Sequence, residues 1–397
     1  MCGIVGYIGR EQAAPILLEG LSRLEYRGYD SAGVAVFDAQ AGALAVRKAK
    51  GRLQVLSDQL HGGADLDSTV GVGHTRWATH GAPSDINSHP QVSRSGKIAV
   101  VHNGIIENYA ELKGFLQSKG VPFVSETDTE VVAQLIEYFY DGDLLAAVGR
   151  VLRRIQGAYA LGILCADCPD QIVAVRKDSP LILGYGEGCN FIASDVTAIL
   201  RHTRSVGYME DGELAVLTRE GIRCCNHLMQ PIEKEIVTVD WEMDAAEKGG
   251  YEHFMFKEIM EQPEALRRCL SPRIREGEIV FEDFSLDQDY IKNMRRIYIV
   301  ACGSSYHVGM VGKYHLERLT RIPVEVALGS EFRYMDPIVD DHTLVIVISQ
   351  SGETLDTMAA LREARRLGGH ILSIVNVVGS SIARESDQVL YTWAGPE

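Results

Sequence analysis

Apolar residues in the first 240 positions come in short runs or alternate with polar residues, and this pattern predicts mostly strands. The runs are bounded by glycine and charged residues, which is typical of strands joined by turns. The predicted strands cover 32–37, 44–47, 70–73, 97–102, 158–165, 171–176, 191–194 and 212–217. A helical spacing appears instead at 14–24, 108–119 and 128–140. Because strands outnumber the clustered helices, this part predicts an α+β sandwich.

The pattern changes near residue 240, where polar and charged residues lead to Gly249 and Gly250 and predict a linker. A helix is expected next at 254–261, ending before Pro263. Further on, strands are expected at 297–301, 323–327, 343–349 and 370–375, with helices at 306–319 and 355–367. Strands separated by helices predict an α/β doubly wound parallel sheet. We therefore expect a domain at 2–240, a linker at 241–250 and a second domain at 251–397.

Charge and hydropathy narrow the possible partners. Lys and Arg total 39 and Asp and Glu total 54, so the 397-residue chain has a formal charge of −15. This acidity argues against nucleic acid or an anionic membrane as the main partner. No apolar run reaches the length of a membrane span, and no signal sequence precedes the first strand. We expect a cytoplasmic protein with neither a nucleic-acid nor a membrane partner.

The eight cysteines are scattered along the chain, and we expect a reduced protein without disulfides. Cys165 and Cys168 have the two-residue gap of a zinc knuckle. No second pair with that gap follows, so neither a metal site nor a cofactor is predicted.

Cys2 differs from the other cysteines because it directly follows Met1. Its small side chain favours removal of Met1, which would leave a thiol and a free α-amino group on one residue. The α-amino group titrates near pH 8, so one amino acid would supply both a nucleophile and its base. The alternative is that Cys2 is a small residue opening a buried strand. The segment Cys-Gly-Ile-Val-Gly resembles the N-terminus of the class II glutamine amidotransferases, which have an N-terminal nucleophile and a four-layer αββα fold.

Further segments match the same family in order and spacing. Arg76, in His-Thr-Arg-Trp-Ala-Thr-His-Gly, has a planar guanidinium that suits a carboxylate. Asn103 and Gly104 end a predicted strand and can supply two neutral donors to an oxyanion. Asp128 lies in Glu-Thr-Asp-Thr-Glu and His89 in Asn-Ser-His-Pro. Taken singly, these could be a surface arginine, an Asn-Gly turn, a helix cap and a structural histidine.

The resemblance implies a role for each of these residues. It implies that Cys2 attacks the carboxamide of L-glutamine and that Asn103 and Gly104 stabilise the oxyanion. Arg76 would hold the α-carboxylate of glutamine, and Asp128 its α-ammonium group. The remaining residues implied at the glutamine site are Trp77, which would also gate the route of ammonia, Thr79, His80 and His89.

The second domain contains two hydroxyl-rich turns, each between a predicted strand and a helix. One is Ser-Gln-Ser-Gly-Glu-Thr at 349–354 and the other is Cys-Gly-Ser-Ser at 302–305. Backbone N–H groups at a helix start and nearby hydroxyls can hold a phosphate at the carboxyl end of a parallel strand. The alternative is ordinary capping by serine and threonine.

Both turns resemble the sugar isomerase domain of the glutamine–fructose-6-phosphate aminotransferase family. The resemblance implies that fructose 6-phosphate is the acceptor of the ammonia and that glucosamine 6-phosphate and glutamate are the products. The implied phosphate-binding residues are Ser304, Ser305, Ser349, Gln350, Ser351 and Thr354. The loops of an asparagine synthetase or a phosphoribosyltransferase are absent from the sequence. A glutaminase fused to a phosphosugar-binding regulatory module without isomerase activity is the alternative.

Members of that family carry two sugar isomerase domains in tandem, and the resemblance implies that this chain ends inside the first. We therefore expect the second domain to be incomplete here and the full-length protein to be a homodimer. For these 397 residues alone, we expect glutamine hydrolysis without amino-sugar synthesis.

Overall fold

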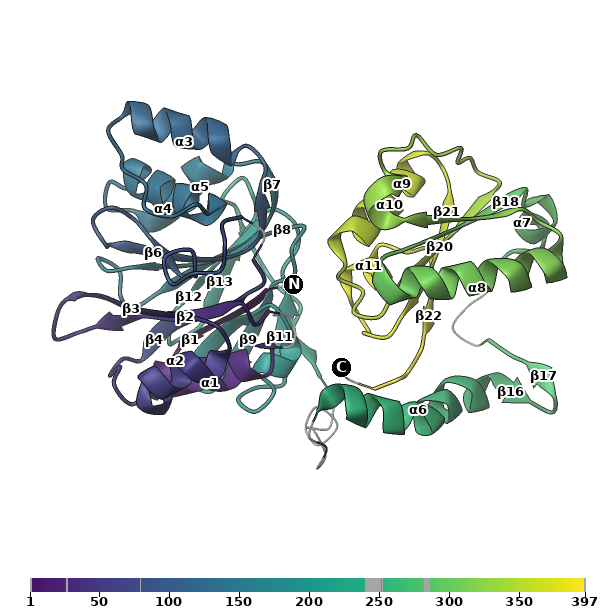
Figure 1. Ribbon diagram of the computed structural model, residues 1–397, viewed down its shortest axis with the longest axis horizontal. Helices are drawn as coiled ribbons and strands as arrows, with labels where there is room; N and C mark the ends of the chain where they lie inside the picture. Colours follow the sequence, from purple (N-terminus) through teal and green to yellow (C-terminus); the bar gives the residue numbers. More distant parts are fainter. Residues whose placement is uncertain are drawn as a thin grey trace. The chain divides into compact units, whose positions relative to one another are not determined.

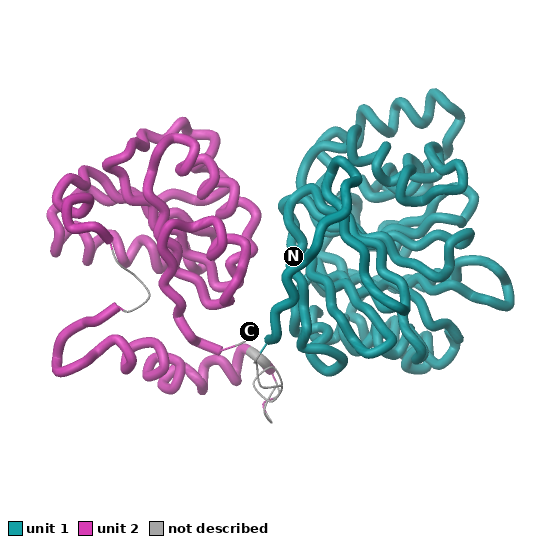
Figure 2. The backbone as a smooth tube through the Cα atoms, turned by 180° about the vertical axis from the view of Figure 1, so that it is seen from behind, with its two compact units in different colours: residues 1–241 teal, residues 242–397 magenta. Residues whose placement is uncertain are grey.

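The computed structural model describes residues 2–25, 28–78, 80–239, 251, 253–281 and 286–395. The chain forms two compact units, residues 1–241 and 242–397 (Figure 2). The predicted linker at 241–250 lies outside the described residues.

The first unit contains two sheets in which all neighbouring strands are antiparallel. The eight-stranded sheet has the order β15 (Val237–Thr238), β11 (Ser205–Tyr208), β9 (Ile182–Gly186), β10 (Cys189–Ala193), β1 (Gly3–Ile8), β4 (Val70–Arg76), β2 (Ser31–Asp38) and β3 (Ala43–Lys50). The seven-stranded sheet has the order β14 (Pro231–Ile232), β13 (Ile222–Cys225), β12 (Glu213–Leu217), β8 (Ile172–Lys177), β7 (Gly157–Cys165), β6 (Ile98–Ile106) and β5 (Gln91–Val92).

Helices cover the outer faces of the two packed sheets, which makes four layers (Figure 1). The helices on the eight-stranded sheet are α1 (Ala13–Ser22) and α2 (Leu53–Gln59), and those on the seven-stranded sheet are α3 (Tyr109–Ser118), α4 (Asp128–Phe139) and α5 (Leu144–Leu152). Three apolar clusters fill the spaces between the layers. The predicted αββα sandwich is confirmed.

Strand β1 is buried on both faces, and this holds the start of the chain in the middle of the sandwich. Ile4 and Ile8 face the cluster between the sheets, whereas Val5 and Tyr7 face the cluster under α1. Each fully buried apolar side chain of this size contributes roughly 1.5–3 kcal/mol. Cys2 immediately precedes this strand and is therefore held in place by a rigid element.

The second unit contains a five-stranded sheet in which every neighbouring pair is parallel. Its order is β19 (Val324–Leu328), β18 (Arg296–Ala301), β20 (Thr343–Ser349), β21 (His370–Val375) and β22 (Gln388–Tyr391). The helices around it are α7 (Gln288–Asn293), α8 (Gly303–Thr320), α9 (Gly329–Phe332), α10 (Leu355–Arg366) and α11 (Ser381–Arg384). Apolar clusters lie on both faces of the sheet, and the predicted doubly wound parallel sheet is confirmed.

The helix expected to end before Pro263 continues, and that prediction was wrong. Helix α6 spans Phe254–Leu270 with Pro263 inside it. A proline inside a helix removes one hydrogen bond and clashes with the carbonyl group of residue i−4, at a cost of about 3 kcal/mol, and in α6 the rest of the helix outweighs this cost. A hairpin of β16 (Ile274–Arg275) and β17 (Glu278–Ile279) follows. No helix in the described ranges is long and apolar enough to cross a membrane.

Candidate active site

The register of the eight-stranded sheet brings Cys2 to the end of β4. Gly3 pairs with Thr75, so the next step of the antiparallel ladder brings Cys2 beside Arg76. The Cys2 Sγ accepts a hydrogen bond from the Trp77 backbone N–H at 3.2 Å and lies 3.5 Å from the Trp77 carbonyl oxygen. Two segments 75 residues apart in sequence therefore meet at the thiol.

The second sheet supplies Asn103 and Gly104 from β6. The Asn103 Nδ2 donates to the Cys2 carbonyl oxygen at 3.0 Å. Gly104 has a φ of 123°, and a Cβ added there would lie 2.0 Å from the carbonyl oxygen of Ala158. Only glycine fits this backbone conformation and this close approach of β7.

Arg76 is buried at the end of β4, and its side chain organises the residues that follow. Its Nη2 donates to the carbonyl oxygens of His80 and Gly81, the latter at 3.1 Å. Its Nη1 is buried without a hydrogen-bond partner in the described chain. Burial lowers the pKa of Arg76, and nearby Cys2 and Asp128 oppose that shift. A buried guanidinium with an unused donor is suited to an anionic ligand.

Asp128 is the first residue of α4, but it is not the residue that caps the helix. The Thr127 hydroxyl accepts from the Glu130 N–H and makes the cap. The Asp128 Oδ2 accepts from the Ile106 N–H at 2.8 Å and lies 3.9 Å from the His102 Nδ1. The carboxylate is therefore buried beside the end of β6 that carries Asn103 and Gly104.

The other predicted glutamine-site residues have different surroundings. Trp77 is 46% exposed and packs edge-on against Tyr29, with 5.6 Å between ring centroids. His80 contacts Arg76 through its carbonyl oxygen, while its ring packs edge-on against Tyr109. The His89 ring lies 4.3 Å from the His74 ring, on the buried side of β4. Thr79 lies outside the described residues.

The Cys2 thiol needs a base at neutral pH. Burial raises its pKa, while the Trp77 N–H, the N-terminal charge and Arg76 oppose that shift. Burial also lowers the pKa of His74 to about 3 and lowers the pKa of His102, so both rings are neutral. Within the residues that the structure describes, no imidazole nitrogen is bonded to the thiol.

Sequence reasoning missed residues that hold the site together. The Asp30 Oδ2 accepts from the Ala78 N–H at 2.8 Å and fixes the segment after Trp77. The Asn87 Nδ2 donates to the Glu126 carboxylate at 3.1 Å, and the Asn87 Oδ1 accepts from the Glu126 backbone N–H at 3.0 Å. These two bonds tie two loops together. In the sequence, Asp30 and Asn87 stand out only as polar residues beside a motif, and only the fold shows what they contact.

The two hydroxyl-rich turns of the second unit are neighbours, because β18 pairs with β20 and Ala301 is opposite Ile348. The Ser349 Oγ lies 3.1 Å from the Thr354 Oγ1 and accepts from the Gly352 N–H at 3.0 Å. The Ser351 Oγ accepts from the Glu353 N–H at 3.2 Å. These bonds lie within the turn that precedes α10. In the described part of the chain, the N-cap residues of α8 and α10, Cys302 and Thr354, make no side-chain cap hydrogen bond, so these bonds do not support the capping alternative.

The remaining predicted residues of these turns take different positions. Ser304 and Ser305 lie in the first turn of α8, because that helix begins at Gly303 rather than at 306 as expected. The carbonyl oxygen of Gln350 accepts from the Asn376 N–H at 3.0 Å, which joins the turn to the end of β21. All six predicted residues thus lie at the carboxyl ends of two adjacent strands.

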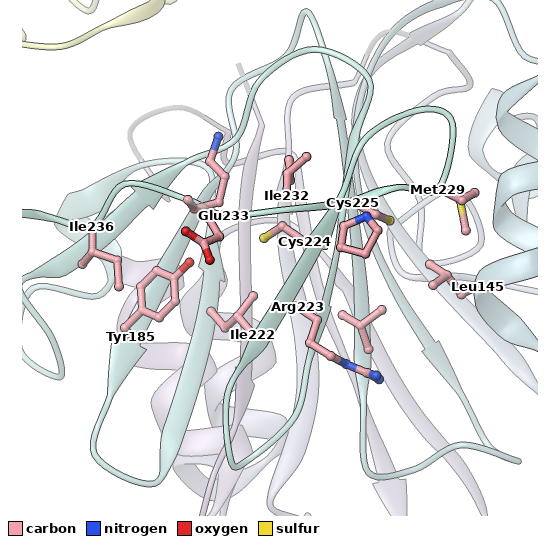
Figure 3. A pocket seen from close by; sticks show the side chains of 13 residues that line it. Leu145, Tyr185, Ile222, Arg223, Cys224, Cys225, Met229, Ile232, Glu233 and Ile236 are labelled. Carbon is pink, nitrogen blue, oxygen red and sulfur yellow. The ribbon is translucent and has the colours of Figure 1, made fainter.

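A separate cavity of about 600 Å³ opens on the first unit, among β9, β12, β13 and β14 (Figure 3). None of the predicted site residues lines it. Cys224 and Cys225 line it, but burial raises the pKa of both thiols, to about 11 for Cys224. These thiols are protonated at neutral pH and are poor nucleophiles.

Two parts of the chain are similar to known domain families. Residues 74–201 match the glutamine amidotransferase domain family, and residues 290–397 match the SIS domain family. The first match includes Arg76, Asn103 and Asp128 and begins after Cys2. Residues 74–201 are therefore similar to glutamine amidotransferase domains, and residues 290–397 are similar to SIS domains.

The curated relatives are more specific. The chain is 57% identical over its whole length to the glutamine–fructose-6-phosphate aminotransferase [isomerizing] of Caldanaerobacter subterraneus subsp. tengcongensis. It is 56% identical to the protein of that name from Clostridium acetobutylicum and 50% identical to that from Thermus thermophilus. Each of these alignments covers the whole of this chain and 65% of the length of the relative.

A solved structure supports the fold alone. The glutamine phosphoribosylpyrophosphate amidotransferase of B. subtilis, complexed with ADP and GMP, aligns with a TM-score of 0.52 at 19% identity. The alignment covers 98% of this chain and 90% of that chain.

Proposed function

We propose that this protein is a glutamine-dependent amidotransferase that hydrolyses L-glutamine at Cys2 and delivers the ammonia to fructose 6-phosphate. The products would be L-glutamate and glucosamine 6-phosphate. The observation that carries the proposal is the meeting of Cys2 Sγ, the Trp77 N–H and the Asn103 amide in one place, from three distant segments. The names of the full-length relatives support the choice of acceptor.

The chemistry at Cys2 follows from its contacts. After removal of Met1, the α-amino group takes the thiol proton and the sulfur attacks the carboxamide carbon of glutamine. The Asn103 Nδ2 and the Gly104 N–H stabilise the oxyanion of the tetrahedral intermediate. Breaking of the C–N bond, with return of the proton to nitrogen, releases ammonia and leaves a thioester. Water then hydrolyses the thioester to glutamate and restores the thiol.

The substrate is held by the two buried charges. Arg76 would bind the α-carboxylate through its unused Nη1, and Asp128 would bind the α-ammonium group. Trp77 would gate the passage of ammonia, and two observations support this role: its backbone N–H contacts the thiol and its ring is exposed. Thr79 and His80 would line the glutamine site, and His89 would support it from the buried side.

The sugar phosphate would bind where β18 and β20 end. Its phosphate would accept hydrogen bonds from backbone N–H groups at the helix starts and from hydroxyls that now bond within the turn. The proposed residues are Ser304, Ser305, Ser349, Gln350, Ser351 and Thr354. We also propose domain limits of 2–240 and 251–397, and a homodimer as the assembled protein.

The two half-sites can be tested separately. Glutamate release measures the first, and calorimetric binding of fructose 6-phosphate measures the second. Replacing both Ser349 and Ser351 with alanine should weaken sugar-phosphate binding at least about 10-fold and leave glutamate release unchanged, since each lost hydrogen bond to a charged group is worth about 1.5–3 kcal/mol.

Ser386→Ala is the matched control for the binding measurement. The Ser386 hydroxyl donates to the Ile382 carbonyl oxygen at 2.7 Å, outside both turns. It should leave binding unchanged. Glutamate release without any binding of fructose 6-phosphate would reject the acceptor, and absence of glutamate release would reject the glutaminase assignment.

A further inference from the structure

We propose that His74 is a positioning residue that sets the orientation of the Asn103 amide, so that Nδ2 and not Oδ1 faces Cys2. The inference rests on the proposed glutaminase function, because it assigns the residue that orders one of the two oxyanion donors. His74 lies on β4 opposite Ile4 of β1 and is fully buried.

The contacts of the His74 ring allow one hydrogen position only. Its Nε2 lies 3.0 Å from the His102 carbonyl oxygen and 3.0 Å from the Asn103 Oδ1. Both partners are acceptors, so Nε2 must carry the hydrogen. The ring is neutral, because burial lowers its pKa to about 3. Nδ1 is then the bare nitrogen, and it is buried without a hydrogen-bond partner in the described chain.

This tautomer determines which way the Asn103 amide points. The Nε2–H of His74 requires the amide oxygen, so the amide nitrogen must take the opposite side. There it lies 3.0 Å from the Cys2 carbonyl oxygen, to which it donates. Turning the amide over would set N–H against N–H at His74 and oxygen against oxygen at Cys2. Both hydrogen bonds would be lost.

The two oxyanion donors therefore need different support. The Gly104 N–H belongs to the backbone, whose position is set by a φ of 123° and by contact with Ala158. The Asn103 amide is a side-chain group and can turn over, so it needs an external partner. His102 cannot serve through its Nδ1, which lies 2.9 Å from the Thr129 hydroxyl. Among the described contacts, His74 is the imidazole that bonds to Asn103.

Two amide substitutions of different length test this assignment. In His74→Gln, the side-chain NH₂ can reach the place of Nε2, whereas in His74→Asn it reaches only the place of Nδ1. We expect His74→Asn to lower kcat for glutamate release by about 10- to 100-fold with KM little changed, because loss of a whole oxyanion donor lowers kcat about 10²- to 10³-fold. His74→Gln should stay within about threefold of the unsubstituted enzyme.

A double-mutant cycle separates positioning from a general structural effect. If His74 acts through the amide, His74→Asn should have no further effect on kcat in an Asn103→Ala background. Equal losses in the Gln and Asn variants would overturn the inference. So would an undiminished effect of His74→Asn in the Asn103→Ala background.

A measurement on the unsubstituted protein covers the case in which the variants fold poorly. ¹⁵N-histidine spectra should show the His74 ring as the neutral Nε2–H tautomer, and an Nδ1–H tautomer would overturn the inference. The unsubstituted protein also separates this inference from the proposed function. If it releases no glutamate, the function fails; if it does and the kinetic pattern above is absent, only the role of His74 fails.

Discussion

Gly104→Ala should damage both the stability and the activity of the first unit. A Cβ at this position would lie 2.0 Å from the Ala158 carbonyl oxygen and 3.0 Å from the Ser179 hydroxyl. A normal C···O contact is about 3.3 Å, so β6 and β7 would have to separate locally by more than about 1 Å. Gly104 is paired with Tyr159 across these strands, and the separation would weaken that pairing.

The magnitude follows from two effects. A non-glycine residue in a sparsely populated backbone region costs about 1–3 kcal/mol. Weakening one hydrogen bond of the ladder removes about 1 kcal/mol more. We therefore expect Gly104→Ala to lower the free energy of unfolding by roughly 2–4 kcal/mol. Displacing the Gly104 N–H from the oxyanion should also lower kcat about 10²- to 10³-fold.

Gly114→Ala is the matched control. Gly114 lies inside α3, and an added Cβ there meets no atom within 4 Å. Alanine should raise the stability by about 0.5–1 kcal/mol at such a helical position and leave kcat unchanged. Urea unfolding followed by circular dichroism, together with glutamate release, measures both effects. A Gly104→Ala protein as stable as the unsubstituted one would refute the steric reasoning, and a stable fold with unchanged kcat would remove Gly104 from the oxyanion site.

Three further outcomes are expected. Arg76→Ala should raise KM for glutamine by at least about 10-fold, since a charged hydrogen bond is worth about 1.5–3 kcal/mol, and an unchanged KM would contradict its role. The pKa of His74 falls on folding from 6.5 to about 3, so the unfolded chain takes up the proton first and stability should decrease as pH falls below 6.5. Between about pH 7.5 and 5.5, the unsubstituted protein should lose about 1.4 kcal/mol more unfolding free energy than His74→Gln, and parallel curves would contradict this. Gly352→Ala should distort the phosphate turn and weaken fructose 6-phosphate binding, because its Cβ would lie 2.0 Å from the Ser380 hydroxyl; unchanged binding would argue against the turn.

The hydrophobic pattern predicted both fold classes because each class has its own periodicity. Alternating short runs indicated the sandwich, and apolar strands such as 343–349 separated by helices indicated the parallel sheet. The pairing of strands could not be predicted in this way. Strand β1 lies between β4 and β10, and β10 is more than 180 residues away in sequence. Such partners are chosen by packing and not by local pattern.

The candidate site was predictable only where a motif carries its own chemistry. Cys2, Arg76 and Asn103 could be found as residue types at family spacing. His74 lies in the same motif as Arg76, but its contacts depend on which imidazole nitrogen meets which oxygen across two sheets. The continuation of α6 past Pro263 was missed for a similar reason, since a local rule was outweighed by the rest of the helix.

The most direct test of the glutaminase assignment is covalent labelling with a diazoketone analogue of glutamine, followed by peptide mass spectrometry. We predict one adduct per chain, at Cys2 with Met1 removed, and protection by added glutamine. Cys189 is the internal control, because it is a half-buried thiol of the same sheet and should stay unlabelled. In parallel, Cys2→Ala should abolish glutamate release and Cys189→Ala should preserve it. An adduct at another cysteine, or glutamate release by Cys2→Ala, would contradict the assignment.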